Sequence, residues 1–286
     1  MFTQVFVKDA HDAPIYALSG NSTQLYTAGS DRLIRRWHWP NGQQDAFNVQ
    51  HTLSPMALAC IGEKTLAVGY LNGDIYLIDT PTKTVLFHDT LSGDNAVSFY
   101  FDKTLNYLLI GTANGMLSAL DLTSKQWLYE DRVATGKIRK IQALHQPSKV
   151  CFSSQSGEIG YFDVHRGVLV HSFMAHGLGA NGLVVRNGLM LSGGKDGFLR
   201  MWDPESCALI HEIPAHKGVI YDLLAFENCW VSGSRDKSIK VWDRVSLKPI
   251  QKLSLHRQSV NALLQQNEHS FVSVSDDKKM AYWTQL

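Results

Sequence analysis

The sequence SGSRDKSIKVWD, residues 232–243, reads as the end of one strand, a tight turn and a second strand. Residues 229–234 combine short apolar and hydroxyl side chains, as half-buried strands do, and residues 235–238 are turn-forming. Residues 239–242 then alternate apolar and polar side chains with period two. We therefore expect a β-hairpin here, not a helix.

The same pattern recurs seven times along the chain. The turn position falls at intervals of 41, 42, 42, 40, 40 and 41 residues, at Asp31, Asn72, Asn114, Ser156, Asp196, Asp236 and Asp277. Six residues after it stands a large apolar residue, at Trp37, Ile78, Leu120, Phe162, Trp202, Trp242 and Trp283. Self-similarity at this period indicates a repeat architecture in which each copy is one supersecondary unit.

Four copies carry two further marks, a histidine about 20 residues before the turn position and a hydroxyl residue four before it. The complete sets are His11, Thr27, Asp31 and Trp37; His176, Ser192, Asp196 and Trp202; His216, Ser232, Asp236 and Trp242; and His256, Ser273, Asp277 and Trp283. Copies two to four have Val68, Ile110 and Phe152 in place of the hydroxyl residue. With these marks the whole chain resembles the WD-repeat β-propeller family.

The resemblance implies an all-β fold in which residues 1–286 form a single seven-bladed propeller of four-stranded antiparallel blades. It also implies that each complete set is a structural tetrad, in which Asp binds His, His binds the hydroxyl, and the hydroxyl accepts from the Trp indole. A Ser-His-Asp set also suggests hydrolysis, but a catalytic triad is needed once, whereas this set recurs four times. We expect no catalytic residues, no cofactor and no metal site.

Ring closure is predicted from the two ends of the sequence. The last copy stops at the end of a third strand, and residues 2–8 match residues 249–255, which form the fourth strand of copy six. We expect residues 2–8 to complete the last blade and leave no open seam.

The charge balance gives no partner class, because 27 Lys and Arg residues stand against 26 Asp and Glu. A near-neutral chain argues against a general nucleic-acid or membrane-surface binder. The N-terminal segment lacks a basic stretch followed by an apolar one, so a cytoplasmic location is expected. The four cysteines and the remaining histidines show no metal-binding spacing.

Specificity in such a fold comes from loops, and the face that carries the histidine loops is the one that WD-repeat proteins most often use for binding. The predicted partner-binding residues around the channel mouth are Tyr16, Met56, Lys140, Asn181, Lys195, Tyr221 and Arg235. Their basic sector suits an acidic or phosphorylated protein segment. The expected function is a non-catalytic scaffold or adaptor, as a monomer or as a subunit of a hetero-complex.

Two alternatives remain open at this stage. One is an enzyme with a small-molecule or metal site in the central channel, although Asp276 is the one carboxylate in the predicted ring. The other is an RNA-associated component that uses Lys137, Arg139, Lys140, Lys195 and Arg235, which a steep salt dependence of RNA binding would reveal.

Overall fold

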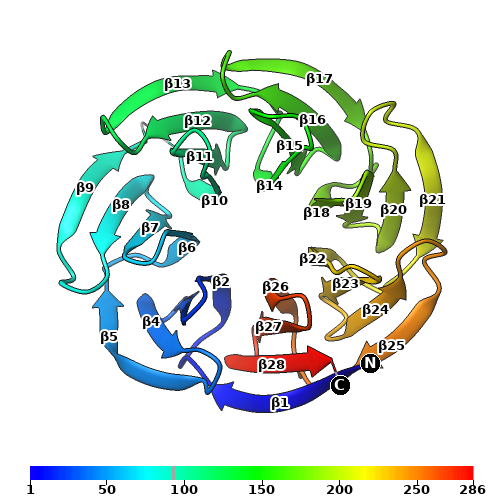
Figure 1. Ribbon diagram of the computed structural model, residues 1–286, viewed down its shortest axis with the longest axis horizontal. Helices are drawn as coiled ribbons and strands as arrows, with labels where there is room; N and C mark the ends of the chain where they lie inside the picture. Colours follow the sequence, from blue (N-terminus) through cyan, green and yellow to red (C-terminus); the bar gives the residue numbers. More distant parts are fainter. Residues whose placement is uncertain (92–93, 286) are drawn as a thin grey trace.

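The chain forms a ring of seven blades around a central channel, as Figure 1 shows for the computed structural model, which describes residues 1–91 and 94–285. Each blade is a four-stranded antiparallel sheet whose strands follow one another in space from the channel outward. The predicted seven-bladed fold is confirmed. The described residues include no helix long and apolar enough to cross a membrane.

Blades one to three follow one another along the chain. Blade one contains β2 (Ile15–Gly20), β3 (Gln24–Gly29), β4 (Leu33–His38) and β5 (Gln43–Gln50). Blade two contains β6 (Pro55–Ile61), β7 (Thr65–Tyr70), β8 (Asp74–Asp79) and β9 (Val85–Thr90). Blade three contains β10 (Ala96–Asp102), β11 (Tyr107–Thr112), β12 (Met116–Asp121) and β13 (Gln126–Arg132).

Blades four to seven continue the ring in the same direction. Blade four contains β14 (Ile138–Ala143), β15 (Lys149–Ser154), β16 (Glu158–Asp163) and β17 (Val168–Met174). Blade five contains β18 (Ala180–Arg186), β19 (Leu189–Gly194), β20 (Phe198–Trp202) and β21 (Leu209–Pro214). Blade six contains β22 (Ile220–Ala225), β23 (Cys229–Ser234), β24 (Ile239–Asp243) and β25 (Pro249–Leu253). Blade seven contains β26 (Val260–Asn267), β27 (Ser270–Ser275), β28 (Lys279–Gln285) and the N-terminal strand β1 (Phe2–Asp9).

The ring closes as the sequence predicts. Strand β1 pairs antiparallel with β28, in a register that runs from Phe2 opposite Gln285 to Asp9 opposite Lys279. The two ends of the chain therefore lie side by side in the last blade (Figure 1). Because β1 covers the outer edge of β28, blade seven has the same four strands as every other blade.

The hairpin predicted for residues 229–242 is confirmed by strands β23 and β24. The residue after each turn position has a positive φ in all seven copies, which is why four copies place glycine there. These φ values are 66° at Arg32, 90° at Gly73, 85° at Gly115, 103° at Gly157, 79° at Gly197, 73° at Lys237 and 71° at Lys278.

The core lies between neighbouring blades. Side chains from the middle strands of one blade pack on those of the next, as Phe226 and Val231 of blade six pack with Phe271 and Trp283 of blade seven. Val68, Ile110 and Phe152 are fully buried in blades two to four. These three blades therefore use apolar packing where the other four have a polar side-chain network.

A β-bulge interrupts the first strand of every blade one residue after that strand begins. The register with the second strand shifts across a single unpaired position in all seven blades. The residues at the bulge are Tyr16, Met56, Val97, Arg139, Asn181, Tyr221 and Asn261. Since a bulge redirects its side chain relative to a regular strand, these seven positions form a distinct ring at one mouth of the channel.

Candidate functional site

The four tetrads have the connectivity that the resemblance implies. In blade six, His216 Nδ1 lies 2.9 Å from Asp236 Oδ2, and His216 Nε2 lies 2.7 Å from Ser232 Oγ. The Trp242 indole N–H donates to the same Oγ at 2.8 Å. The corresponding contacts in blades one, five and seven lie between 2.8 and 3.2 Å. Each set is therefore a buried brace between the turn, the second strand and the third strand, with no open position for a substrate.

Burial lowers the pKa values of three tetrad histidines and so favours their neutral form. It lowers the pKa of His216 to about 4, and Asp236 offsets only part of that effect. Burial also lowers the pKa values of His11 and His176. For Asp236, burial opposes ionisation but is outweighed by hydrogen bonds from Ser238 and by His216, so its pKa falls to about 2.

These pKa values predict that acid destabilises the fold in two steps. Between pH 6.5 and 4 the unfolded chain binds a proton that the folded His216 does not, so stability falls as the pH falls. The lowered pKa values of His11 and His176 act in the same direction. Below pH 3.8 the unfolded chain also protonates carboxylates such as Asp236, and more stability is lost. We expect the thermal midpoint to drop by about 5 °C or more from pH 6.5 to 4, measured by calorimetry. A variant at the exposed His211 should keep the same slope, and a midpoint constant over this window would contradict the prediction.

The bulge ring shows which residues of blades three and four stand at the channel mouth. Lys140 was predicted at the mouth of blade four, but the bulge residue of β14 is Arg139, and Lys137 precedes the strand. In blade three the bulge residue is Val97. Copies three and four lack the histidine that precedes the first strand in the other copies. The sequence therefore indicates the first residue of these two strands less clearly.

Lys140 follows Arg139 in β14 and forms an ion pair with a carboxylate of blade six. Its Nζ lies 2.7 Å from Asp222 Oδ1, which comes from the first strand of blade six. The same carboxylate accepts the backbone N–H groups of Leu223 and Leu263 at 3.0 and 2.9 Å. Asp222, which the sequence analysis missed, is therefore a second channel carboxylate and joins blades four, six and seven.

The other predicted partner-binding residues lie on the ring or directly beside it. Tyr16, Met56, Asn181 and Tyr221 are bulge residues, and Tyr16 is 38% exposed. Lys195 and Arg235 follow the second strands of blades five and six, next to the bulges of the same blades. Asn181 is buried, so it contributes to the floor of the mouth, not to its rim.

Blades four to six give the mouth a basic sector, defined here as Lys137, Arg139, Lys195 and Arg235. Within residues 1–91 and 94–285, none of these four cations forms an ion pair with a carboxylate. Burial lowers the pKa of Lys137, and the positive charges of Arg139 and Lys195 lower it further. Positive charge is thus concentrated at a site that is partly removed from water and where no described carboxylate pairs with it.

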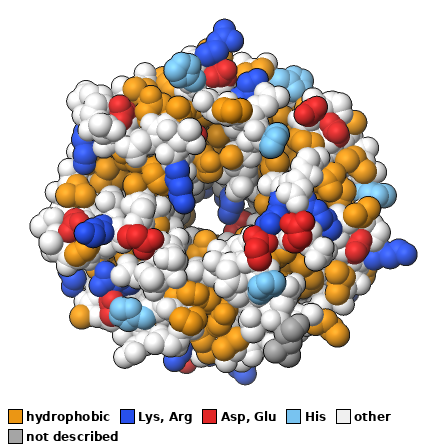
Figure 2. Space-filling view, in the orientation of Figure 1, with side chains coloured by type: hydrophobic (Ala, Val, Ile, Leu, Met, Phe, Trp, Pro, Cys, Tyr) orange, Lys and Arg blue, Asp and Glu red, His pale blue; other side chains and the backbone are white. Residues whose placement is uncertain are grey.

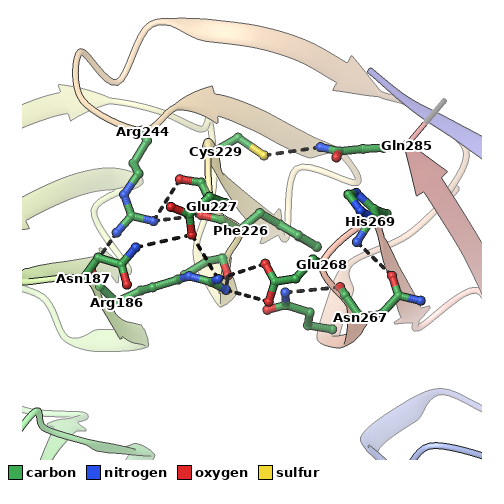
Figure 3. Close-up of polar contacts among 12 residues, drawn as sticks. Arg186, Asn187, Phe226, Glu227, Cys229, Arg244, Asn267, Glu268, His269 and Gln285 are labelled. Carbon is green, nitrogen blue, oxygen red and sulfur yellow. Dashed lines mark hydrogen bonds and ion pairs between the residues drawn. The ribbon is translucent and has the colours of Figure 1, made fainter.

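On the face of the disc opposite the bulge ring, charged side chains link blades five, six and seven through ion pairs and hydrogen bonds. Figure 2 shows the opening at the centre of the disc, with charged side chains of both signs gathered on one side of its rim. In the close-up of Figure 3, Arg186 bridges Glu227 of blade six and Glu268 of blade seven, at 3.3 and 2.8 Å. Arg244 donates to the backbone oxygens of Arg186 and Phe226 at 2.6 and 2.8 Å. Because Arg186 and Arg244 already have their acceptors, we assign this network to blade-to-blade packing.

A cavity of about 510 Å³ lies beside the innermost strands of blades four to seven. Lys140 and Arg186 contribute polar groups to its lining, and Val184, Leu223 and Leu263 contribute apolar side chains. No group of three or more His, Cys, Asp or Glu side chains within the described part of the chain is placed to hold a metal ion.

Comparison with protein families matches the description "WD domain, G-beta repeat" to residues 2–38, 167–203 and 207–243. Each range runs from a fourth strand through the next blade's third strand and contains one complete tetrad. The chain is a seven-bladed β-propeller that contains WD repeats. Striatin of Rattus norvegicus is 24% identical to the propeller over an alignment of 229 residues, and the match covers 71% of this chain. The match spans 29% of striatin, so less than a third of that relative's length is represented.

Proposed function

We propose that the chain is a non-catalytic protein-interaction scaffold whose channel mouth at blades four to six binds an acidic segment of a partner protein. The observation that carries this proposal is the basic sector, in which four cations from three blades lack a carboxylate partner among the described residues. Uncompensated charge that is partly desolvated favours an external anion, which would restore the compensation that the chain itself does not supply.

A protein segment fits this mouth better than a nucleic acid does. The chain is close to neutral, and the four cations of the basic sector come from three neighbouring blades, whereas a polynucleotide needs a longer basic track. Tyr221 stands beside Arg235 in that sector, and Tyr16 and Met56 supply less polar contacts on blades one and two. Aromatic and Arg side chains of this kind are the usual energetic centres of protein interfaces.

Charge reversal in the basic sector tests the proposal. We expect the double variant Lys195→Glu and Arg235→Glu to reduce capture of the partner at least tenfold, because two attractive contacts become repulsive. The measurement is affinity purification from the native cell, followed by quantification of each captured protein and by titration of the purified partner.

The matched control reverses Lys64 and Lys103, two exposed residues on turns between first and second strands. This control makes the same change in net charge at the opposite end of the channel, and it should leave capture unchanged. Equal capture by the channel-mouth variant and the wild type would contradict the proposal and move the interface elsewhere.

A further inference from the structure

Two buried donors at the channel mouth have no acceptor among residues 1–91 and 94–285. The side-chain Nδ2 of Asn181 and the Nε of Arg139 are both inaccessible to solvent and make no hydrogen bond. Asn181 as a whole is only 4% exposed. Since a buried donor without an acceptor destabilises a fold, such a pair in one place indicates an acceptor supplied from outside the chain.

Blade seven shows what the same position looks like when it is satisfied. Asn261 occupies the bulge that corresponds to Asn181, and its Nδ2 donates to Ile15 O at 2.8 Å and to Asp276 Oδ1 at 2.7 Å. In blade five the residue at the place of Asp276 is Lys195. The acceptor carboxylate of blade seven is therefore replaced by a cation, and the amide of Asn181 is left without a partner.

Local contacts bring the basic residues of blades four and five together around Asn181. The backbone N–H of Gln155 donates to Lys137 O at 2.8 Å, and the Gln155 carbonyl lies against Gly179 of blade five. The aliphatic stem of Lys195 lies over the same Gly179, two residues before Asn181. A Cβ at position 179 would lie 2.8 Å from the Gln155 oxygen, so glycine is required for this close approach.

Arg139 completes the arrangement. Its bulge position corresponds to that of Asn181 on the next blade, and burial lowers the pKa of its guanidinium. The charges of Arg139 and Lys195 both lower the pKa of Lys137. We call Lys137, Arg139, Asn181 and Lys195 the donor cluster.

We propose that the donor cluster binds a phosphoryl group carried by the protein segment that occupies the channel mouth. This inference rests on the proposed function and makes it specific: the segment is recognised when it is phosphorylated. The cluster combines three cations with an amide donor and contains no carboxylate that would repel a dianion. A phosphoryl group carries close to two negative charges at pH 7 and has three terminal oxygens, whereas a carboxylate has one charge and two oxygens.

The direct test is an NMR titration of the full chain with inorganic phosphate and, separately, with acetate at matched ionic strength. The side-chain amide of Asn181 should shift saturably with phosphate, and at least tenfold more acetate should be needed for half of that shift. The side-chain amide of Asn261 is the control within the same spectrum, because its N–H groups already have acceptors. It should not move with either anion.

A pair of variants separates binding from folding. Asn181→Leu should weaken phosphate binding at least fivefold, seen at neighbouring backbone amides, without lowering the thermal midpoint, because it removes a donor that has no partner. Asn261→Leu should lower the midpoint by several degrees, because two hydrogen bonds are lost. If Asn181→Leu fails to fold, Arg139→Gln replaces it in the binding measurement.

The outcomes distinguish this inference from the proposed function. Equal shifts with acetate and phosphate would overturn the phosphoryl assignment and leave an acidic segment as the ligand. No shift with either anion would also overturn it, while loss of partner capture in the charge-reversed double variant would still support the interaction site. An RNA oligonucleotide that binds the cluster more tightly than a phosphoserine peptide of equal length would overturn the assignment to a protein segment.

Discussion

Deletion of residues 1–9 should lower the thermal midpoint by at least about 10 °C. The deletion removes β1, the outer strand of blade seven, together with Phe2, which is 1% exposed. The ring of Phe2 packs on Phe226 and Phe271 at centroid distances of 5.1 and 5.0 Å. Loss of a buried Phe alone costs about 3–5 kcal/mol. Each kcal/mol corresponds to about 2–4 °C in a domain of 150–250 residues.

The strand also ties blade seven to blade six. The backbone N–H of Phe2 donates to Gln251 Oε1 at 2.8 Å, and Gln251 Nε2 donates to Phe2 O at 2.7 Å. Without β1, the backbone of β28 would be exposed along its outer edge, which favours pairing between molecules. We therefore expect the truncated chain to show both a lower midpoint in calorimetry and a larger apparent size in gel filtration.

Two point variants in β1 show how much of the stability lost in the deletion comes from the packing of Phe2. Val5→Ala changes a residue of β1 that is 51% exposed, so it should cost less than about 1 kcal/mol. Phe2→Ala should fall between Val5→Ala and the deletion, since it removes the aromatic packing but keeps the strand. A truncated chain with the midpoint of the full chain would show that β1 does not hold the ring closed.

The architecture could be predicted from the sequence because each blade repeats one turn. The turn position and the large apolar residue six positions later fix the second and third strands in all seven copies, and the opening hairpin matches β23 and β24 closely. Ring closure followed from the missing fourth strand of the last copy. These features depend on local backbone requirements, which short sequence patterns record directly.

The channel mouth was predicted less well, because its first strands carry a weaker signal. In blade four the start of β14 was displaced, so Lys140 was given the position that Lys137 occupies, two residues before the bulge residue Arg139. Another feature of the sequence locates the start of the first strand in each blade. Each first strand begins with a small or apolar residue, and that residue is buried in every blade. These residues are Ile15, Pro55, Ala96, Ile138, Ala180, Ile220 and Val260.

Contacts that skip a blade left no signal in the sequence. Lys140 meets Asp222, and Arg186 meets Glu268, across 82 residues in each case. Such pairs form because long side chains extend along the inner wall of the channel to a blade that is not the nearest neighbour. The spacing of the repeats in the sequence does not predict these contacts. The unpartnered amide of Asn181 likewise emerged only when its surroundings were compared with those of Asn261.

Replacement of Ser232 by Ala should destabilise the fold by about 2–4 kcal/mol. The Oγ of Ser232 is fully buried and contacts both His216 Nε2 and Trp242 Nε1, at 2.7 and 2.8 Å. Both partners would remain buried without their hydrogen bond, and each such group costs about 1–3 kcal/mol. Chemical denaturation with urea should therefore show a lower midpoint at an unchanged slope.

The matched control is Ser246→Ala in the same blade, where the hydroxyl bonds Asp243 at 2.7 Å on an exposed turn. It makes the same chemical change at the surface, so we expect a loss below about 1 kcal/mol. Asp236→Ala tests whether the tetrad acts as one unit. Because Ser232 and Asp236 both bind His216, the double variant should lose less stability than the sum of the two single variants. Strict additivity, or a Ser232→Ala chain as stable as the control, would mean that the tetrad does not brace the blade, and that packing alone holds blade six as it holds blades two to four.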